Sequence, residues 1–175
     1  LPRFEQYDLS RVQVVVWEGA AMPETCIDRL RQLVPRLATN FSMTESTTAI
    51  TVVMPTDELD VLSNTVGLPF PGVEVRIVDE SGLTLPPGRA GELQARSRYN
   101  MLGYWRRPAE SVATLDDDGW LHTGDLAEQR PDGRFRIVGR LKEMYKSGGY
   151  NVYPREVESV IEAHPAVAMA AVVSR

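Results

Sequence analysis

Apolar positions near the start of the chain change from a continuous run to a helical spacing and back again. Residues 12–17 form a near-continuous run rich in valine, which is typical of a strand buried on both faces of a parallel sheet. Residues 23–35 begin and end with proline and carry apolar side chains on one helical face, which predicts a helix. Residues 37–41 predict a second strand, and Thr44 and Glu45 open a helix or turn. The order strand, helix, strand predicts the edge of an α/β layer.

The pattern changes after residue 55, where apolar and polar side chains begin to alternate. Residues 73–77 and 92–95 alternate in this way and are separated by glycine and proline turns, as expected for antiparallel strands. Arg-Pro-Asp-Gly at residues 130–133 predicts a tight turn that joins a strand over 121–127 to another over 135–138. This part of the chain therefore predicts a small antiparallel sheet or barrel attached to the α/β layer.

The remaining segments predict two short helices and a terminal strand. Residues 108–115 predict a helix leading to three aspartates at 116–118, which we expect to form a solvated loop. Pro154 begins a second helix with an apolar face, and residues 166–173 predict a strand. One helix and one strand are too little to form a core of their own. We therefore expect a boundary near residues 140–142.

Composition narrows the class of protein. With 19 basic and 24 acidic side chains the formal net charge is −5, and no basic stripe suggests a nucleic-acid partner. No apolar run approaches the roughly 20 residues of a membrane-spanning helix, and residues 1–5 lack the apolar core of a signal peptide. Cys26 is the only cysteine, so a reducing, cytoplasmic location is expected. Its place beside Ile27 predicts a small buried hydrophobe.

The strongest chemical signal is Gly-Trp-Leu-His-Thr-Gly-Asp at residues 119–125, followed by Arg140. A Thr-Gly-Asp that closes an apolar strand puts the Asp125 carboxylate at the mouth of a sheet. An ionised carboxylate only accepts hydrogen bonds, which suits a pair of hydroxyls, and a guanidinium donates through a fixed fork that suits phosphate. The two residues therefore suggest a clamp for the sugar and phosphate of a nucleotide. The plainer interpretations, an exposed aspartate in a turn and a surface ion pair, stay open at this point.

These segments resemble a known superfamily when they are taken with Asn-Phe-Ser-Met-Thr-Glu at 40–45 and Lys-Ser-Gly-Gly-Tyr at 146–150. Together they are similar to the acyl-adenylate-forming, or AMP-binding, enzymes, and within them to the acyl-CoA synthetases and fatty-acid–CoA ligases. The resemblance implies that ATP activates a small carboxylic acid, fatty or aromatic, as acyl-AMP before transfer to coenzyme A. It also implies Mg²⁺ and a possible homodimer.

The resemblance assigns a role to each matching residue. Asp125 would hold the ribose hydroxyls, Arg140 the ribose and phosphate oxygens, Thr44 the α-phosphate, Glu45 the Mg²⁺ ion, and Lys142 the hinge between domains. Contacts with the nucleotide, the acyl group or coenzyme A are implied for Gly19, Ala20, Ala21, Asn40, Phe41, Ser42, Thr44, Asp125, Arg140, Ser147, Gly148 and Gly149. An aromatic face such as that of Phe41 can add roughly 1–3 kcal/mol by stacking on a base.

The same resemblance implies an organisation into domains. Residues 1–140 match the C-terminal part of the AMP-binding N-domain, with the α/β layer over 1–60 and the antiparallel sheet or barrel over 61–140. Residues 141–175 match the beginning of the small, mobile α+β C-terminal domain. The family's glycine-rich phosphate loop and late catalytic lysine have no match, so the chain resembles an internal fragment that is weakly active or inactive alone.

Departures from the family pattern leave alternatives open. Ser42 stands where relatives have glycine, and Tyr150 where acyl-CoA synthetases have glutamate. An amino-acid adenylation domain is one alternative, although that group has proline where Met43 stands, and a non-catalytic nucleotide-binding module is another. We interpret His122 as a packing residue and His164 as a helix-end residue, and no Cys/His spacing suggests zinc.

Overall fold

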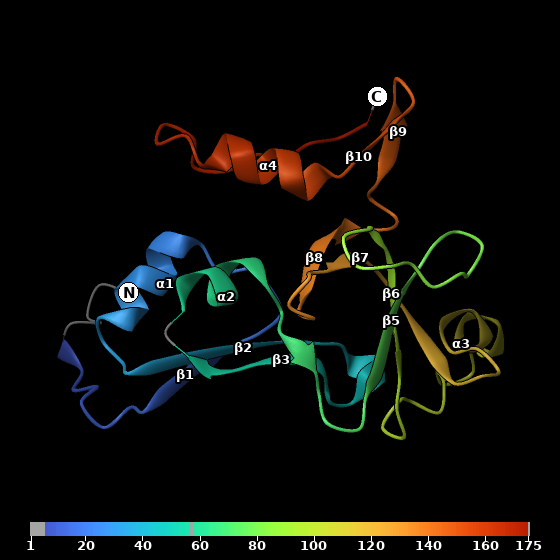
Figure 1. Ribbon diagram of the computed structural model, residues 1–175, viewed down its shortest axis with the longest axis horizontal. Helices are drawn as coiled ribbons and strands as arrows, with labels where there is room; N and C mark the ends of the chain where they lie inside the picture. The colour runs from blue at the N-terminus through green and yellow to red at the C-terminus, as the bar shows by residue number, and fades with distance from the viewer. Residues whose placement is uncertain (1–5, 57, 175) are drawn as a thin grey trace.

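The computed structural model describes residues 6–56 and 58–174, and it contains two four-stranded sheets and a small hairpin (Figure 1). The first five residues, where no signal-peptide pattern was found, lie outside the described part. The first sheet has the order β1-β2-β3-β4. Its strands are β1 (Val14–Trp17), β2 (Arg36–Ser42), β3 (Ala49–Thr56) and β4 (Leu68–Pro69). Only β1 and β2 are parallel, and β3 runs antiparallel to both of its neighbours.

Two helices cover one face of the first sheet (Figure 1). They are α1 (Glu24–Arg31) and α2 (Leu59–Asn64). Their apolar sides close a core over the strands, made of Ile27, Val34, Leu37, Val53, Val61 and Leu62. The α/β edge expected from the sequence is therefore confirmed, but β3 and α2 were not predicted.

Two expectations about this layer are wrong. Residues 12–17 were expected to be buried on both faces, but β1 is the edge strand of this sheet and Val16 is 58% exposed. Cys26 was expected to be buried, but it is exposed. It lies one residue before Ile27, and neighbouring helical residues point about 100° apart, so only Ile27 reaches the core.

The second sheet is antiparallel with the order β5-β6-β7-β8. Its strands are β5 (Glu74–Val78), β6 (Gly91–Arg96), β7 (Trp120–Gln129) and β8 (Phe135–Arg140), and α3 (Pro108–Thr114) precedes β7. The sheet is open, so of the two expected forms the structure has the sheet and not a closed barrel. Its core contains Ile50, Val73, Ile77, Leu93, Ala95, Ala127 and Phe135. Ile50 belongs to the first sheet, so the two sheets share this core.

Backbone hydrogen bonds join the two sheets at Gly67. The N–H of Phe135 donates to Gly67 O at 2.9 Å, and the N–H of Val66 donates to Phe135 O at 2.8 Å. The Thr51 hydroxyl, which is fully buried, donates to Val66 O at 2.7 Å. Gly67 has a φ of +88°, and a Cβ there would overlap the carbonyl of Val52. The junction therefore needs glycine at this position.

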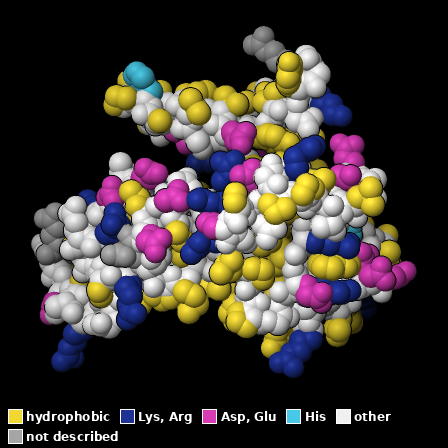
Figure 2. Space-filling model, viewed as in Figure 1, with side chains coloured by type: hydrophobic (Ala, Val, Ile, Leu, Met, Phe, Trp, Pro, Cys, Tyr) yellow, Lys and Arg dark blue, Asp and Glu magenta, His cyan; other side chains and the backbone are white. Residues whose placement is uncertain are grey.

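The C-terminal segment consists of a hairpin and one helix beside β8 (Figure 1). Its elements are β9 (Tyr145–Ser147), β10 (Tyr150–Val152) and α4 (Pro154–Glu162). The apolar side chains Val157, Val160 and Ile161 of α4 are exposed, and the space-filling view shows apolar atoms along this segment (Figure 2). Only Pro154 of the helix is buried.

The strand expected over residues 166–173 is wrong. Residues 166–173 pair with no strand among the described residues, and two of their amides donate to carboxylates of α4 instead. The N–H of Ala170 donates to Glu162 Oε1 at 3.2 Å, and that of Val172 to Glu158 Oε1 at 3.0 Å. Without a strand partner, β-rich composition does not produce a ladder.

Candidate functional site

Asp125 and Arg140 form an ion pair across two neighbouring strands. They are register partners on β7 and β8, and Arg140 Nε lies 2.9 Å from Asp125 Oδ1. The Asp125 side chain is 7% exposed, whereas that of Arg140 is 63% exposed. The pairing predicted from the sequence therefore holds a buried carboxylate beside a guanidinium that is largely open to solvent.

Asp125 does not close its strand, as had been expected, but lies within β7, which continues to Gln129. The strand is interrupted at this point, because residues 123–125 all lie opposite the single residue Leu93 of β6. The Thr123 hydroxyl donates to Leu93 O at 2.7 Å and accepts the N–H of Asp125 at 3.1 Å. Gly124 takes a φ of +69°, which favours glycine. A bulge, rather than a strand end, thus aims the carboxylate.

Burial is the main influence on the acidity of Asp125. It raises the pKa of the carboxyl above its ordinary value, Arg140 lowers that pKa, and Glu143 and Glu92 raise it further. A buried carboxylate needs hydrogen-bond donors, and the Arg140 guanidinium is one of them. The remaining lone pairs of the Asp125 carboxylate can therefore accept hydrogen bonds from a ligand. Such a group is a candidate ligand-binding residue.

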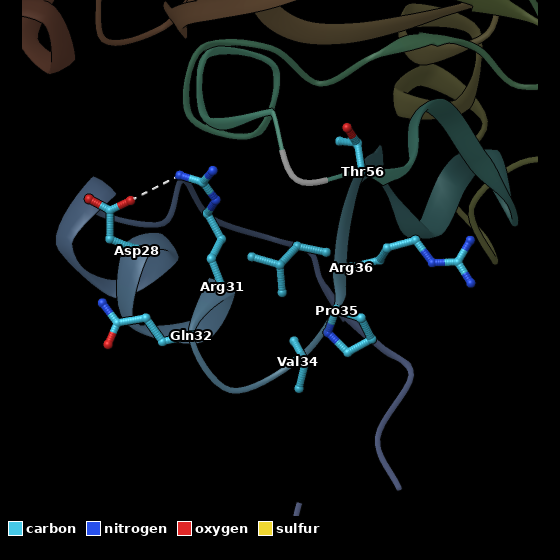
Figure 3. Close-up of a pocket in the computed structure, with 8 residues that line it drawn as sticks. Asp28, Arg31, Gln32, Val34, Pro35, Arg36 and Thr56 are labelled. Atoms are coloured by element: carbon cyan, nitrogen blue, oxygen red, sulfur yellow. Dashed lines mark hydrogen bonds and ion pairs between the residues drawn. The ribbon is translucent and has the colours of Figure 1, made fainter. Parts of the chain in front are cut away.

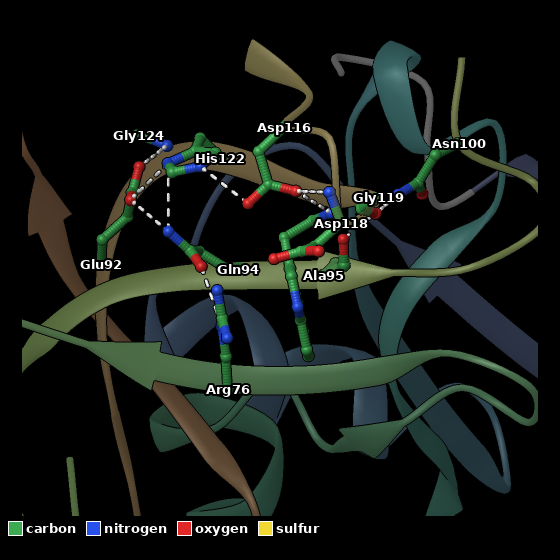
Figure 4. Close-up of polar contacts among 11 residues, drawn as sticks. Arg76, Glu92, Gln94, Ala95, Asn100, Asp116, Asp118, Gly119, His122 and Gly124 are labelled. Carbon is green, nitrogen blue, oxygen red and sulfur yellow. Dashed lines mark hydrogen bonds and ion pairs between the residues drawn. The ribbon is translucent and has the colours of Figure 1, made fainter. Parts of the chain in front are cut away.

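A polar network that includes Glu92, Gln94 and His122 contacts this bulge through the Gly124 amide (Figure 4). Glu92 Oε1 accepts the N–H of Gly124 at 3.2 Å, and Glu92 Oε2 lies 3.0 Å from both Gln94 Nε2 and His122 Nδ1. His122 Nε2 lies 3.7 Å from Asp116 Oδ2. His122 is therefore a polar network residue, and the expectation that it only packs is wrong.

The acidic loop before β7 is less solvated than expected. Asp116 is partly buried, and its Oδ1 accepts the N–H groups of Trp120 at 2.8 Å and Asp118 at 3.0 Å. Asp117 and Asp118 are exposed, as the sequence suggested. One aspartate of the three thus caps a turn, while two face water.

Thr44 and Glu45 lie in a short 3-10 helix, Thr44–Ser46, that follows β2. Ser46 is 2% exposed and holds this turn, because its hydroxyl accepts the N–H of Met43 at 3.2 Å and bonds Met43 O at 2.8 Å. Thr44 is exposed and Glu45 is partly buried. The turn predicted from the sequence is confirmed, but the role of Ser46 was not predicted.

A distant loop fixes Glu45. The Tyr104 hydroxyl donates to Glu45 Oε1 at 2.6 Å, and the N–H of Met101 donates to Glu45 O at 2.7 Å. This hydrogen bond to Glu45 raises the pKa of Tyr104. The two residues are 59 positions apart in sequence, so no local pattern could have indicated the contact.

The parallel strands β1 and β2 end at the same edge, which carries six of the predicted site residues. Ser42 donates to Glu18 Oε2 at 3.3 Å and so links the two strand ends. Asn40 Oδ1 is buried, and no described residue forms a hydrogen bond with it. Phe41 is partly buried and packs on the shared core, and Gly19 has a φ of +84° in an exposed turn. Ala20 and Ala21 follow it and are exposed.

The predicted hinge and loop residues lie beyond β8. Lys142 is exposed in the turn between β8 and β9. Ser147, Gly148 and Gly149 form the end of the β9–β10 hairpin, where the two glycines have φ values of +58° and +86°. Tyr150 is 78% exposed beside them. Within the described ranges, no hydrogen bond or ion pair joins this hairpin, or the turn at Glu45, to the Asp125–Arg140 pair.

The described residues also form cavities outside this site, but no metal-ligand cluster and no membrane-spanning helix. A cavity of about 410 Å³ lies at the amino end of β2, beside α1, and therefore away from the strand ends with Asn40 and Ser42 (Figure 3). No group of three or more potential metal ligands occurs in residues 6–56 and 58–174. None of the helices in those same ranges is long and apolar enough to cross a bilayer.

Comparison with known proteins identifies the family. The family described as AMP-binding enzyme matches residues 1–105, which is more than half of the chain. The chain therefore belongs to the AMP-binding enzyme family.

Curated relatives are longer proteins. A long-chain-fatty-acid–CoA ligase of Escherichia coli is 37% identical over 165 residues, which cover 94% of this chain and 29% of the relative. The 4-coumarate–CoA ligase 4 of Arabidopsis thaliana is 36% identical, over 99% of this chain and 31% of the relative. The chain thus spans about three tenths of the length of these relatives.

Solved structures share the fold. The amide bond synthetase McbA from Marinactinospora thermotolerans has a TM-score of 0.86 and 38% identity, covering 99% of this chain and 36% of that one. The O-succinylbenzoate coenzyme A synthetase from Bacillus subtilis, solved in complex with AMP, has a TM-score of 0.86 and 28% identity. That match covers 98% of this chain and 35% of the synthetase.

Proposed function

We propose that this chain forms the ribose- and adenine-binding wall of an ATP-dependent carboxylic acid–CoA ligase. The observation that carries the proposal is the ion pair between buried Asp125 and exposed Arg140, at 2.9 Å. The carboxylate retains acceptor capacity for the two ribose hydroxyls, and the guanidinium retains donors for phosphate oxygens. The AMP complex of the related coenzyme A synthetase supports an adenine nucleotide as the ligand.

Asn40 supports the adenine part of the proposal. Its Oδ1 is buried without a hydrogen-bond partner among the described residues, and buried polar atoms are nearly always satisfied. The exocyclic amino group of adenine is proposed as the missing donor, which requires the Asn40 side chain to turn outward because its Oδ1 is closed to solvent in this structure. Gly19, Ala20, Ala21, Phe41 and Ser42 are proposed to line the same edge of the sheet.

Thr44 and Glu45 are proposed to face the phosphates and Mg²⁺. One oxygen of Glu45 accepts from Tyr104, which leaves the other for a cation. Mg²⁺ is commonly held by one or two carboxylates together with substrate phosphates, so a single glutamate fits. When bound, the ion would neutralise negative charge on the phosphates.

The proposed reaction has two steps. A carboxylate oxygen of the acid attacks the α-phosphorus of ATP and pyrophosphate leaves; the thiol sulfur of coenzyme A then attacks the acyl carbon and AMP leaves. Lys142 is proposed as the pivot between the steps, and Ser147, Gly148 and Gly149 as contacts of coenzyme A. The names of the fatty-acid and coumarate ligase relatives support a fatty or aromatic acid. A homodimer and a cytoplasmic location remain predictions.

An amine is a second candidate for the acyl acceptor. The structurally similar McbA is an amide bond synthetase, and Tyr150, where related synthetases have glutamate, lies in the hairpin proposed to contact coenzyme A. Incubation of the chain with a synthetic acyl-adenylate and either coenzyme A or an amine would separate them. A thioester product supports the ligase, and an amide product supports the second candidate.

Calorimetric titration with AMP tests the nucleotide site. We expect AMP to bind, and Asp125→Asn to weaken it by about tenfold or more, since hydrogen bonds to a charged group contribute about 1.5–3 kcal/mol each. Asp117→Asn is the matched control, because Asp117 is exposed in the neighbouring loop, and it should leave the affinity unchanged. Absence of AMP binding, or equal affinities of wild type and Asp125→Asn, would contradict the proposal.

A further inference from the structure

Glu92 is a charged side chain that the proposed chemistry leaves without a role. It lies on β6, its side chain is 15% exposed, and no Lys or Arg in the described part of the chain forms an ion pair with it. A largely buried carboxylate needs hydrogen-bond donors, and the donors around Glu92 show what its side chain holds in place.

The bulge in β7 supplies the first of these donors. The register between β6 and β7 jumps from the pair Glu92 and Leu126 to the pair Gln94 and His122. Residues 123–125 share Leu93 as their counterpart on β6, and the Leu93 carbonyl accepts the Thr123 hydroxyl at 2.7 Å. The Gly124 N–H donates instead to Glu92 Oε1 at 3.2 Å. The Glu92 side chain thus supplies the hydrogen-bond acceptor for the Gly124 amide within the bulge.

Glu92 is itself held in place from the other side (Figure 4). Its Oε2 accepts from Gln94 Nε2 at 3.0 Å and, when Nδ1 carries the proton, from His122 at 3.0 Å. Arg76 Nε donates to Gln94 Oε1 at 2.9 Å, which fixes the amide in turn. A chain of contacts thus leads from β5 through β6 to the residue before Asp125.

We propose that Glu92 is a positioning residue for Asp125, acting through the backbone of Gly124. It fixes the left-handed bulge and so aims the Asp125 carboxylate at the ribose. Through space the Glu92 charge opposes ionisation of Asp125, because it raises the pKa of that carboxyl. A favourable contribution of Glu92 to binding must therefore come from geometry rather than from charge. This inference rests on the proposed nucleotide site.

Comparing the binding of two nucleotides distinguishes a change in the position of the Asp125 carboxylate from a general loss of protein stability. AMP and 2′,3′-dideoxy-AMP differ only in the hydroxyls assigned to Asp125. In Glu92→Gln an amide nitrogen replaces the oxygen that accepts from Gln94 Nε2, so two donors meet and the side chain is displaced from Gly124. We therefore expect this variant to weaken AMP binding by about fivefold to twentyfold, within the range of coupling between contacting residues. The affinity for dideoxy-AMP should change by less than about twofold, because distant effects are small and additive. Glu74→Gln is the control, since Glu74 lies on the same sheet and, among the described residues, pairs with Arg96 alone.

A double-mutant cycle completes the test. In an Asp125→Asn background, Glu92→Gln should change AMP affinity by less than about twofold, because the carboxylate it positions is gone. The inference is overturned if Glu92→Gln weakens both nucleotides equally, or if the two substitutions have multiplying effects. Wild-type protein that does not distinguish AMP from dideoxy-AMP would instead overturn the ribose role of Asp125, and this inference with it.

Hydrogen exchange gives a second readout that needs no ligand. The Gly124 amide should be protected in the wild type and exchange faster in Glu92→Asp, whose shorter side chain withdraws the acceptor. This variant also serves if Glu92→Gln does not fold. Unchanged Gly124 protection in folded Glu92→Asp would contradict the inference.

Discussion

Asp125 combines a buried position with a charge. Its side chain is 7% exposed and has one cationic partner, Arg140, whose guanidinium is mostly in water. Burial raises the pKa of Asp125, so the ionised form is disfavoured in the folded protein relative to the unfolded chain. Functional sites commonly accept such a loss of stability.

This conflict predicts that Asp125→Asn stabilises the protein. A raised folded-state pKa makes wild-type stability greatest below the ordinary pKa of 3.8 and lowers it as pH rises through the folded value. The neutral amide introduced by the substitution carries no charge to bury, so the variant does not lose stability as the pH rises. We therefore expect its Tm to exceed the wild-type Tm at pH 7 by about 2–4 °C, equivalent to about 1 kcal/mol. Thermal unfolding followed by circular dichroism at pH 7 and pH 3.5 measures the difference.

The advantage of the variant should shrink at the lower pH, where the wild-type carboxyl is protonated. A variant that is less stable than wild type at both pH values by the same amount would show that the contact with Arg140, and not burial, dominates.

At the scale of elements, the junction at Gly67 determines how the two sheets meet. Gly67 bonds Phe135 of β8 through its backbone and lies against the backbone of Val52 in β3. Its φ of +88° turns the chain from α2 into β4. Because backbone atoms surround the missing Cβ, the neighbours cannot move aside as a flexible side chain would.

We therefore expect Gly67→Ala to destabilise the protein by about 4 kcal/mol or more, because left-handed strain is added to backbone overlap. Gly72→Ala is the matched control: its φ is +83°, but no atom lies within 4 Å of the added Cβ. That variant should lose about 1–2 kcal/mol from strain alone. Urea unfolding of both proteins measures the two values. Equal losses would mean that the close approach of Val52 has no energetic weight.

At the scale of the whole molecule, the two sheets form one body with a shared core, while the C-terminal segment contributes little to it. Among the described residues of α4 only Pro154 is buried, and Val160 is 76% exposed. The helix contacts β8, and Tyr153 lies near Gly139. A domain boundary at residues 140–142 remains a prediction that fits this arrangement.

Native-state hydrogen exchange should differ between the two sides of residues 140–142. Amides of α4 are expected to open with a free energy at least about 2 kcal/mol below those of β6 and β7, because few buried contacts hold the helix. Exchange followed by mass spectrometry of peptides from both regions makes the comparison. Similar protection in α4 and in the central strands would show that the segment is an integral part of the sheet body.

Periodicity and turn chemistry predicted most elements of this chain. Helices near residues 24–31, 108–114 and 154–162 and the strand pairs of the second sheet are confirmed, because side-chain period and proline positions are local properties. Residues 166–173 have a strand-like composition but no partner, and pairing is not local. The six-residue helix α2 carries too few turns to produce a periodic signal.

The sequence alone determined the family, the alternation of elements and the pair Asp125 and Arg140, because residue types and spacing carry that information. Only the tertiary structure decided that the carboxylate lies in a bulge within a strand, that Glu92 holds this bulge, and that Tyr104 holds Glu45 across 59 positions. These contacts depend on strand register and on loops meeting in space. Such long-range packing leaves no periodic trace in a single sequence.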